Sequence, residues 1–504
     1  MSRKIINYKY PIIVLIFTII GFLLRVLAAR KIGSFWFDEY FTVYFSNFSL
    51  KEMFGYLAYE NNPPLHFLLT HYWVKLVGES EFWVRFLSII FGTVSIPTAY
   101  FLGKKLFSQS AGLISSLLIA FTSFNIYYSV EARMYGLLLW LGLFSLLFFY
   151  QSLHNGRWYW WLGLFITNTL LYYTHLTSIL LIFGQAAYFA YFYFSTKKKL
   201  LVFLLVQTLS FLCFLPWLIN FFQHSVLEGN LNQSWYFNTP YLKYFFAHFF
   251  GDLFAYQLGI RSLGAVFGLF GLILFLSIFK ISLRNGEFAL KFNLTKEIIF
   301  LWLILLPGLI IAFLLNYGVT KYLIVLTPAI YLLSANFISA HLVKFRHLLV
   351  VITVLILLFS CTYANLFIGL YDWDKMARYI ELAETNNDII ITHSYFQSLL
   401  LSHYYHGRTA IKGFYPLNDD ESDNLRLVKN NWEKVVNEKN VNKINDYIKN
   451  YQGVFLVYRV SGALNDNNII FAWFISHGWQ LDFNKSRSFE DANVFYFKKN
   501  NGNL

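Results

Sequence analysis

Two adjacent acidic residues are the first candidates for chemistry. The segment FWFDEYF, residues 35–41, places Asp38 and Glu39 among aromatic residues, shortly after the first long apolar run. A carboxylate can act as a general base that removes a proton from an attacking hydroxyl group. The alternative is an ordinary helix cap or a solvated turn. Because a charge at a membrane edge is costly and tends to serve a function, we favour the chemical role.

A second group of charges lies in the segment YYSVEARMY, residues 127–135. Glu131 and Arg133 are separated by one residue there, in a short predicted turn between two apolar runs. Arginine can bind phosphate through two parallel hydrogen bonds, so Arg133 is a candidate phosphate ligand. Taken alone, a local ion pair or an arginine that extends toward the membrane surface is at least as good an interpretation.

Other cations could serve the same phosphate. Lys321 and Tyr322 precede a later apolar run, where an interfacial anchor is the ordinary interpretation. Combined with Arg133, Lys321 offers a second cation on the same face, and Arg25 and Arg85 are further candidates. Such cations would stabilise the negative charge that develops on a lipid-phosphate leaving group.

Three histidines, His66, His71 and His175, fall on the same predicted side of the membrane. None has the spacing of a metal site with another histidine or cysteine. A satisfied interfacial histidine is the favoured interpretation of each, and we predict neither a metal site nor a cofactor.

The composition indicates a membrane protein. Of the 504 residues, 57% are hydrophobic and 13% are charged, whereas soluble proteins have about 25% charged residues. The net charge of +13 does not indicate nucleic-acid binding, because most basic residues before position 370 form short clusters between apolar runs, as cytoplasmic anchors do. Cys213 and Cys361 both fall inside apolar runs, which predicts buried thiols rather than disulfides.

Eleven apolar runs approach the ~20 residues that a helix needs to cross hydrocarbon. A cytoplasmic N-terminus places the clusters of lysine and arginine inside throughout, and an odd number of spans then places the C-terminal region outside. The runs are roughly 11–29, 86–103, 111–129, 134–151, 158–174, 177–195, 200–221, 262–279, 297–316, 322–340 and 347–368.

On this topology, residues 30–85 form an outer loop far longer than a typical connection of about 4–6 residues. Within it, residues 65–77 are apolar but too short to span, which predicts an interfacial helix. Residues 222–261 form a second outer loop. We predict a transmembrane domain over residues 1–368 and a small extracytoplasmic α/β domain over 369–504. Its predicted elements are a helix over 374–384 and strands over 388–392, 453–458 and 493–497.

The order of several motifs resembles a known family. FWFDE, NNPPLHFLLTHYWVKLVGESEFWVRFLS, GTVSIPTAYFLGKKLF and IYYSVEARMYGLLL resemble the dolichyl-phosphate-mannose-protein mannosyltransferase-like family, of the glycosyltransferase family 39 and 83 type. They also resemble the bacterial lipid A aminoarabinose transferases. YYTHLTSILL, KYLIVLTP and YDWDKMARYI are similar to the downstream segments, so the resemblance covers nearly the whole chain.

The resemblance implies a C-type glycosyltransferase (GT-C) fold, which is an all-α polytopic membrane domain of about eleven transmembrane helices with the small α/β domain after it. It implies an inverting, mannosyltransferase-like enzyme of the cell membrane. Such an enzyme moves a sugar from a polyprenyl-phosphate carrier to a protein, lipid or envelope-glycan acceptor at the outer face.

The same resemblance assigns roles to acidic and acceptor-side residues. Asp38 would be the general base on the acceptor hydroxyl, and Glu39 would support it or position the acceptor. Glu131 matches the family's second acidic position. His66 and Asn62, beside the double proline, would contact or position the acceptor, although the family often has histidine or aspartate where this chain has Asn62.

The donor phosphate would be held by Arg133 and Lys321, with Tyr322 and Arg85 beside them. The family often has arginine at the position of Lys321, and lysine keeps the charge but lacks the bidentate fork. The main alternative is a transporter or flippase of lipid-linked sugars, and another is a noncatalytic scaffold. Transporters usually place polar residues near the bilayer midplane and often contain repeats, whereas here the charges lie at the outer rim and no repeat is visible.

Overall fold

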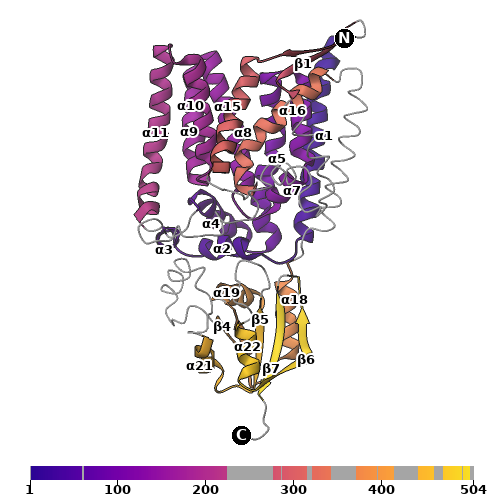
Figure 1. Ribbon diagram of the computed structural model, residues 1–504, viewed down its shortest axis with the longest axis vertical. Coiled ribbons are helices and arrows are strands. Elements are labelled where there is room, and N and C mark those ends of the chain that lie inside the picture. Colours follow the sequence, from indigo (N-terminus) through magenta and orange to yellow (C-terminus); the bar gives the residue numbers. More distant parts are fainter. Residues whose placement is uncertain are drawn as a thin grey trace. The chain divides into compact units, whose positions relative to one another are not determined.

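The computed structural model describes residues 2–58, 62–223, 276–284, 287–314, 320–341, 371–393, 395–413, 441–458, 469–490 and 492–499 (Figure 1). These residues form two compact units. The membrane unit contains the described residues up to 31, from 62 to 219 and from 276 to 341. The sheet unit contains residues 32–58 and 220–223 and those from 371 onward.

The membrane unit is built from long apolar helices. Six are long and apolar enough to cross a membrane among the described residues, and a bent pair would make a seventh. The chain is therefore a multi-pass membrane protein. The six are α1 (Ser2–Lys31), α5 (Glu81–Leu106), α8 (Tyr135–Asn155), α11 (Lys197–Phe221), α15 (Lys296–Leu314) and the continuous η4 (Thr320–Leu326) and α16 (Thr327–His341).

The predicted count of eleven spans is not confirmed. Two predicted runs form the shorter helices α9 (Trp158–Thr174) and α10 (Ser178–Tyr193). The run 347–368 and most of 262–279 lie outside the described residues, as does most of the predicted outer loop 222–261. A hairpin of β1 (Phe279–Arg284) and β2 (Glu287–Phe292), which the apolar pattern did not predict, precedes α15.

The predicted span 111–129 is not one straight helix. It consists of α6 (Gln109–Phe121) and α7 (Ser123–Val130), bent by 56° at the extended residue Thr122. The break deprives the last carbonyls of α6 of helical partners. Arg25 of α1 donates to the carbonyl oxygens of Ile119 at 3.1 Å and Ala120 at 3.2 Å. The candidate phosphate ligand Arg25 thus stabilises this bend.

A buried polar network joins four helices of the bundle. Asn168 of α9 accepts a hydrogen bond from Ser145 of α8 at 2.6 Å and donates to Gln185 of α10 at 3.0 Å. It also donates to Gln207 of α11 at 3.1 Å, and Gln185 donates back to Ser145 at 2.7 Å. Such interhelical bonds satisfy polar groups that would otherwise face hydrocarbon.

The sheet unit contains a five-stranded mixed sheet with the order β4-β3-β5-β7-β6. β3 is parallel to β4 and β5, whereas β7 is antiparallel to β5 and β6. The strands are β3 (Asp388–Thr392), β4 (Ala410–Gly413), β5 (Gly453–Tyr458), β6 (Trp479–Ser488) and β7 (Asn493–Lys499). The helices after residue 371 are α18 (Trp373–Ala383), α19 (Tyr395–Tyr404), α21 (Ile444–Ile448) and α22 (Ile469–Ser476).

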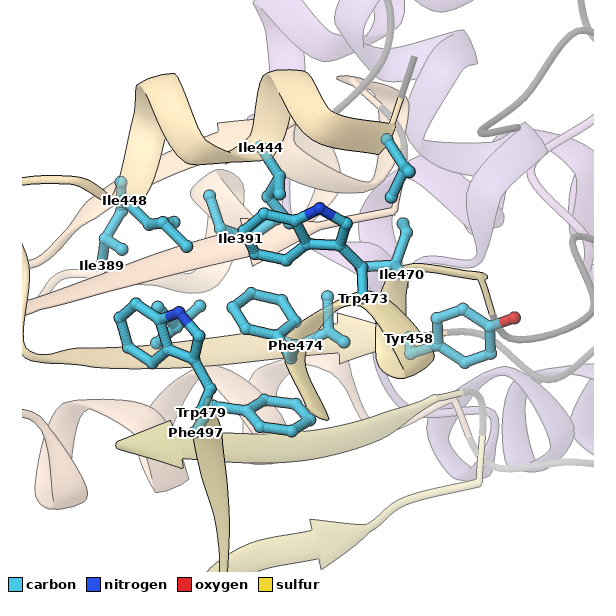
Figure 2. Close-up of a cluster of buried hydrophobic side chains, with 13 residues drawn as sticks. Ile389, Ile391, Ile444, Ile448, Tyr458, Ile470, Trp473, Phe474, Trp479 and Phe497 are labelled. Atoms are coloured by element: carbon cyan, nitrogen blue, oxygen red, sulfur yellow. The ribbon is translucent and has the colours of Figure 1, made fainter. Parts of the chain in front are cut away.

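The core of this unit explains why its strands could be predicted. All five residues of β3 and all six of β5 are buried. Figure 2 shows the cluster, in which Trp473 and Phe474 of α22 pack with isoleucines of β3 and α21. The ring of Phe474 stacks on that of Phe497 at 4.5 Å. The predicted helix 374–384 and the three predicted strands are confirmed.

Three short helices complete the description. α2 (Phe37–Ser46) and α3 (Leu50–Leu57) belong to the sheet unit, and α4 (Leu65–Val77) belongs to the membrane unit. The bounds of α4 confirm the helix predicted over residues 65–77.

Candidate functional site

Glu131 and Arg133 lie in a buried turn between α7 and α8. The backbone N–H of Arg133 donates to the carbonyl oxygen of Glu131 at 2.7 Å, and Ser88 of α5 donates to the carbonyl oxygen of Arg133 at 3.0 Å. A Cβ atom at Gly136 would lie 2.9 Å from the carbonyl oxygen of Ser88, so only glycine lets α8 approach α5 this closely. The Glu131 and Arg133 side chains are only 4% and 6% exposed. The turn is therefore fixed against α5.

Both predicted phosphate ligands lie over aromatic rings in the membrane unit. The guanidinium of Arg133 is 5.9 Å from the ring centroid of Phe67 in α4. The Lys321 ammonium is 5.5 Å from the ring centroids of Tyr135 and Tyr322. An aromatic face attracts a cation without removing its ability to donate hydrogen bonds to an anion. Both cations are thus held in position by aromatic rings.

His175, between α9 and α10, is subject to the positive charges of both cations. Its pKa is lowered to about 3, first by burial and then by the positive charges of Arg133 and Lys321. Its ring stacks on Tyr322 at 5.2 Å, and its Nδ1 atom accepts a hydrogen bond from the Thr177 backbone N–H at 3.1 Å. The ring of Tyr322 therefore contacts both His175 and Lys321, and the charge of Arg133 also acts on this imidazole.

His66 is a second buried, neutral imidazole in this region. Burial lowers its pKa to about 3, and the charge of Arg133 adds to the effect. The side chain is 3% exposed, and its Nε2 atom makes no hydrogen bond within the part of the chain that the structure describes. A neutral imidazole can donate or accept a hydrogen bond with a substrate hydroxyl.

The lowered pKa values of His66 and His175 predict that the free energy of unfolding depends on pH. Each has a lowered pKa in the folded protein, so the unfolded chain binds more protons between pH 6.5 and about 3. The free energy of unfolding should therefore fall as the pH drops below 6.5, by roughly 2 kcal/mol per histidine at pH 5.

The measurement is thermal unfolding in detergent from pH 7.5 to pH 5. His175→Gln should flatten the pH dependence, because glutamine does not titrate. His406→Gln, at an exposed position of the sheet unit, is the matched control. An equally steep loss of stability in His175→Gln and His406→Gln would contradict the assignment.

The acidic pair lies at the start of α2 in the sheet unit. Glu39 is 1% exposed, and its Oε2 atom accepts a hydrogen bond from the backbone N–H of Trp36, the N-cap residue, at 3.3 Å. Glu39 therefore closes the first turn of α2, as the helix-cap alternative predicts. Asp38 is half-buried, and the positive end of the helix dipole favours its negative charge.

The remaining predicted residues lie in the membrane unit. Arg85 of α5 is fully buried and donates to the carbonyl oxygen of Ala29 at 3.5 Å. Asn62 is half-buried just before α4. No group of three histidine, cysteine, aspartate or glutamate residues that could hold a metal ion occurs among the described residues.

Sequence reasoning missed His175 as a member of the site. The segment YYTHLTSILL is similar to a downstream segment of the family, but no local spacing links its histidine to a cation. Lys321 and Tyr322 are far away in the sequence, and only the folded chain shows that the Tyr322 ring contacts both Lys321 and His175.

Comparisons with known proteins agree with this architecture. Residues 61–220 match the family model described as dolichyl-phosphate-mannose-protein mannosyltransferase. No curated protein sequence matches the chain significantly.

Among solved structures, ArnT from Cupriavidus metallidurans in the apo state has a TM-score of 0.63 at 13% identity, covering 96% of this chain and 97% of that one. ArnT bound to undecaprenyl phosphate has a TM-score of 0.59 at 12% identity, with the same coverage. The Archaeoglobus fulgidus oligosaccharyltransferase AglB, in complex with an inhibitory peptide and a dolichol-phosphate, gives 0.51 at 12% identity, covering 89% of this chain and 69% of that one. At these identities the likeness shows a common fold.

Proposed function

We propose that this chain, a multi-pass membrane glycosyltransferase with the GT-C fold, transfers a sugar from a polyprenyl-phosphate carrier to an acceptor hydroxyl group with inversion at the anomeric carbon. One observation carries the proposal: Arg133 lies over the ring of Phe67, and Lys321 lies over the ring of Tyr322, which stacks on the buried His175. Two positioned cations over aromatic rings suit a phosphate that carries an apolar tail.

The reaction is a single displacement. The acceptor oxygen forms a bond with the anomeric carbon while Asp38 takes the hydroxyl proton, and the bond from the anomeric carbon to the phosphate oxygen breaks. Arg133 and Lys321 stabilise the negative charge that this leaves on the lipid phosphate. Glu131, in the same turn as Arg133, helps to define the position of that cation.

The identity of the carrier is supported by the solved relatives. ArnT was solved with undecaprenyl phosphate and AglB with a dolichol-phosphate and a peptide. We extend the lipid-phosphate donor to this chain, with a protein, a lipid or an envelope glycan as the acceptor. His66 and Asn62 would contact or position it, and the reaction would need no metal or other cofactor.

The proposed location is the outer face of the cell membrane. The clusters of lysine and arginine between the apolar runs support a cytoplasmic N-terminus and an extracytoplasmic sheet unit. The donor would then be used on the side where envelope acceptors are found.

A reconstituted assay tests the transfer. The purified protein in lipid nanodiscs is supplied with a polyprenyl-phosphate sugar that is radiolabelled in the sugar, together with a panel of peptide, lipid and glycan acceptors. We expect free polyprenyl phosphate and labelled acceptor to appear in equal amounts.

A parallel experiment in liposomes addresses transport. Movement of the intact labelled lipid across the bilayer, with the sugar–phosphate bond never cleaved, would contradict the enzyme assignment and support a flippase.

A further inference from the structure

We propose that the C-terminal part of the sheet unit holds the candidate base in place, with the hydroxyl group of Tyr404 as a positioning residue for α2. This rests on the proposed function, because Asp38 acts as a base only if the chain transfers a sugar. The evidence is a set of contacts between residues 32–46 and residues 371–404, all within the sheet unit.

The first contact is a short backbone bridge ahead of α2. Tyr371 donates its N–H to the carbonyl oxygen of Ile32 at 3.0 Å and accepts the N–H of Ser34 at 3.0 Å. The Ser34 hydroxyl accepts the N–H of Trp373 at 2.9 Å. Gly33 between them has φ +83°, and a Cβ atom there would collide with the Tyr371 carbonyl oxygen. Glycine at position 33 therefore permits the bridge.

The second contact lies two residues before α2 begins. The backbone N–H of Phe35 donates to the hydroxyl oxygen of Tyr404, the last residue of α19, at 2.7 Å. The Phe35 side chain is fully buried. A buried N–H group without an acceptor costs about 1–3 kcal/mol, so the tyrosine hydroxyl fixes this point of the chain.

Aromatic packing anchors the body of α2 on the same helix. Phe396 of α19 meets the rings of Phe37 at 5.6 Å and Phe41 at 4.4 Å, both edge-on. Phe41 follows the acidic pair in sequence, and Trp36, which like Phe37 precedes it, stacks on Tyr371 at 6.1 Å. Asp38 is therefore flanked along the chain by residues that contact the C-terminal part.

The consequence concerns the geometry of the carboxylate. Asp38 lies three residues after Phe35. Loss of the Tyr404 acceptor therefore lets the backbone that leads into the first turn of α2 move more freely. A displacement of about 1 Å at a reacting group can cost a hundredfold in rate. Because the backbone bridge and the aromatic packing persist, we expect a smaller loss, of about tenfold.

The test compares two adjacent tyrosines of the same region. Tyr404→Phe removes the acceptor for the Phe35 N–H and keeps the ring. Tyr405→Phe is the matched control, because the Tyr405 hydroxyl contacts Glu384 and the N–H of Thr409, away from α2. We expect Tyr404→Phe to lower kcat about tenfold with the KM for the lipid-linked sugar unchanged, and Tyr405→Phe to alter neither.

Hydrogen–deuterium exchange gives a readout that is independent of activity. The amide of Phe35 should exchange faster in Tyr404→Phe than in the wild type and at the wild-type rate in Tyr405→Phe. Equal kcat values and equal exchange rates of the Phe35 amide in the two variants would overturn this inference and leave the proposed function intact. A wild-type protein that cleaves no lipid-linked sugar would overturn the proposed function, and the positioning role with it.

Discussion

Asp38→Asn is expected to reduce sugar transfer by about 100-fold to 10,000-fold, the usual contribution of a general base. Asparagine has nearly the same shape as aspartate and suits the first turn of a helix, but it cannot accept the proton of the acceptor hydroxyl. The measurement is the initial rate of polyprenyl-phosphate release at saturating donor and acceptor. Binding of the donor should be retained, because the phosphate ligands are not changed.

The matched control is Glu79→Gln. Glu79 is an exposed carboxylate that follows the C-terminal end of α4, and the mechanism assigns it no role. Glu79→Gln should keep the wild-type rate, and both variants should give the same size-exclusion profile in detergent. Wild-type kcat in a correctly folded Asp38→Asn protein would remove Asp38 from the mechanism.

Arg133→Ala is expected to weaken donor binding by about 100-fold. Hydrogen bonds to charged groups contribute about 1.5–3 kcal/mol, and each 1.4 kcal/mol is a factor of ten in affinity. Arg133→Lys should fall between the wild type and Arg133→Ala, because it restores the charge without the bidentate fork. The measurement is direct binding of polyprenyl phosphate to purified protein in nanodiscs.

Arg30→Ala serves as the control for this variant. Arg30, at the end of α1, also lies over an aromatic ring, at 5.4 Å from the centroid of Phe82, but its side chain is exposed. Arg30→Ala removes a comparable cation–π contact and should leave the affinity for the donor unchanged. If Arg133→Ala bound the lipid phosphate as tightly as Arg30→Ala, Arg133 would not be a phosphate ligand.

Local patterns were sufficient to predict much of the fold. The strand over 453–458 is a short, wholly apolar run with both faces buried, and the helix over 374–384 has an apolar stripe that includes Met376 and Ile380. Apolar content also predicted the membrane helices. It could not predict the break at Thr122, because a bent and a straight helix have the same hydropathy. The Arg25 side chain that bonds to the carbonyl groups freed at the break comes from a helix far away in the sequence.

The candidate site was predictable residue by residue but not as an arrangement. The acidic pair was found from its sequence, yet its two members have different surroundings, since Glu39 caps α2. The contacts of the preceding residues with Tyr371 and Tyr404 span more than 300 positions. No short-range pattern encodes such pairs. The roles of Asp38, Glu131, Arg133 and Lys321 stay predictions for the experiments above.

The amide network around Asn168 also constrains how the protein can be made. During synthesis, α9 leaves the ribosome before α10 and α11, so Asn168 enters the membrane before Gln185 and Gln207 exist to bond with it. Until then, release of α9 into lipid would leave the polar Asn168 side chain facing hydrocarbon. We therefore expect α9 to stay near the insertion machinery. We therefore expect α9, α10 and α11 to enter the bilayer as a group, so that a chain truncated before Gln207 would be retained and degraded.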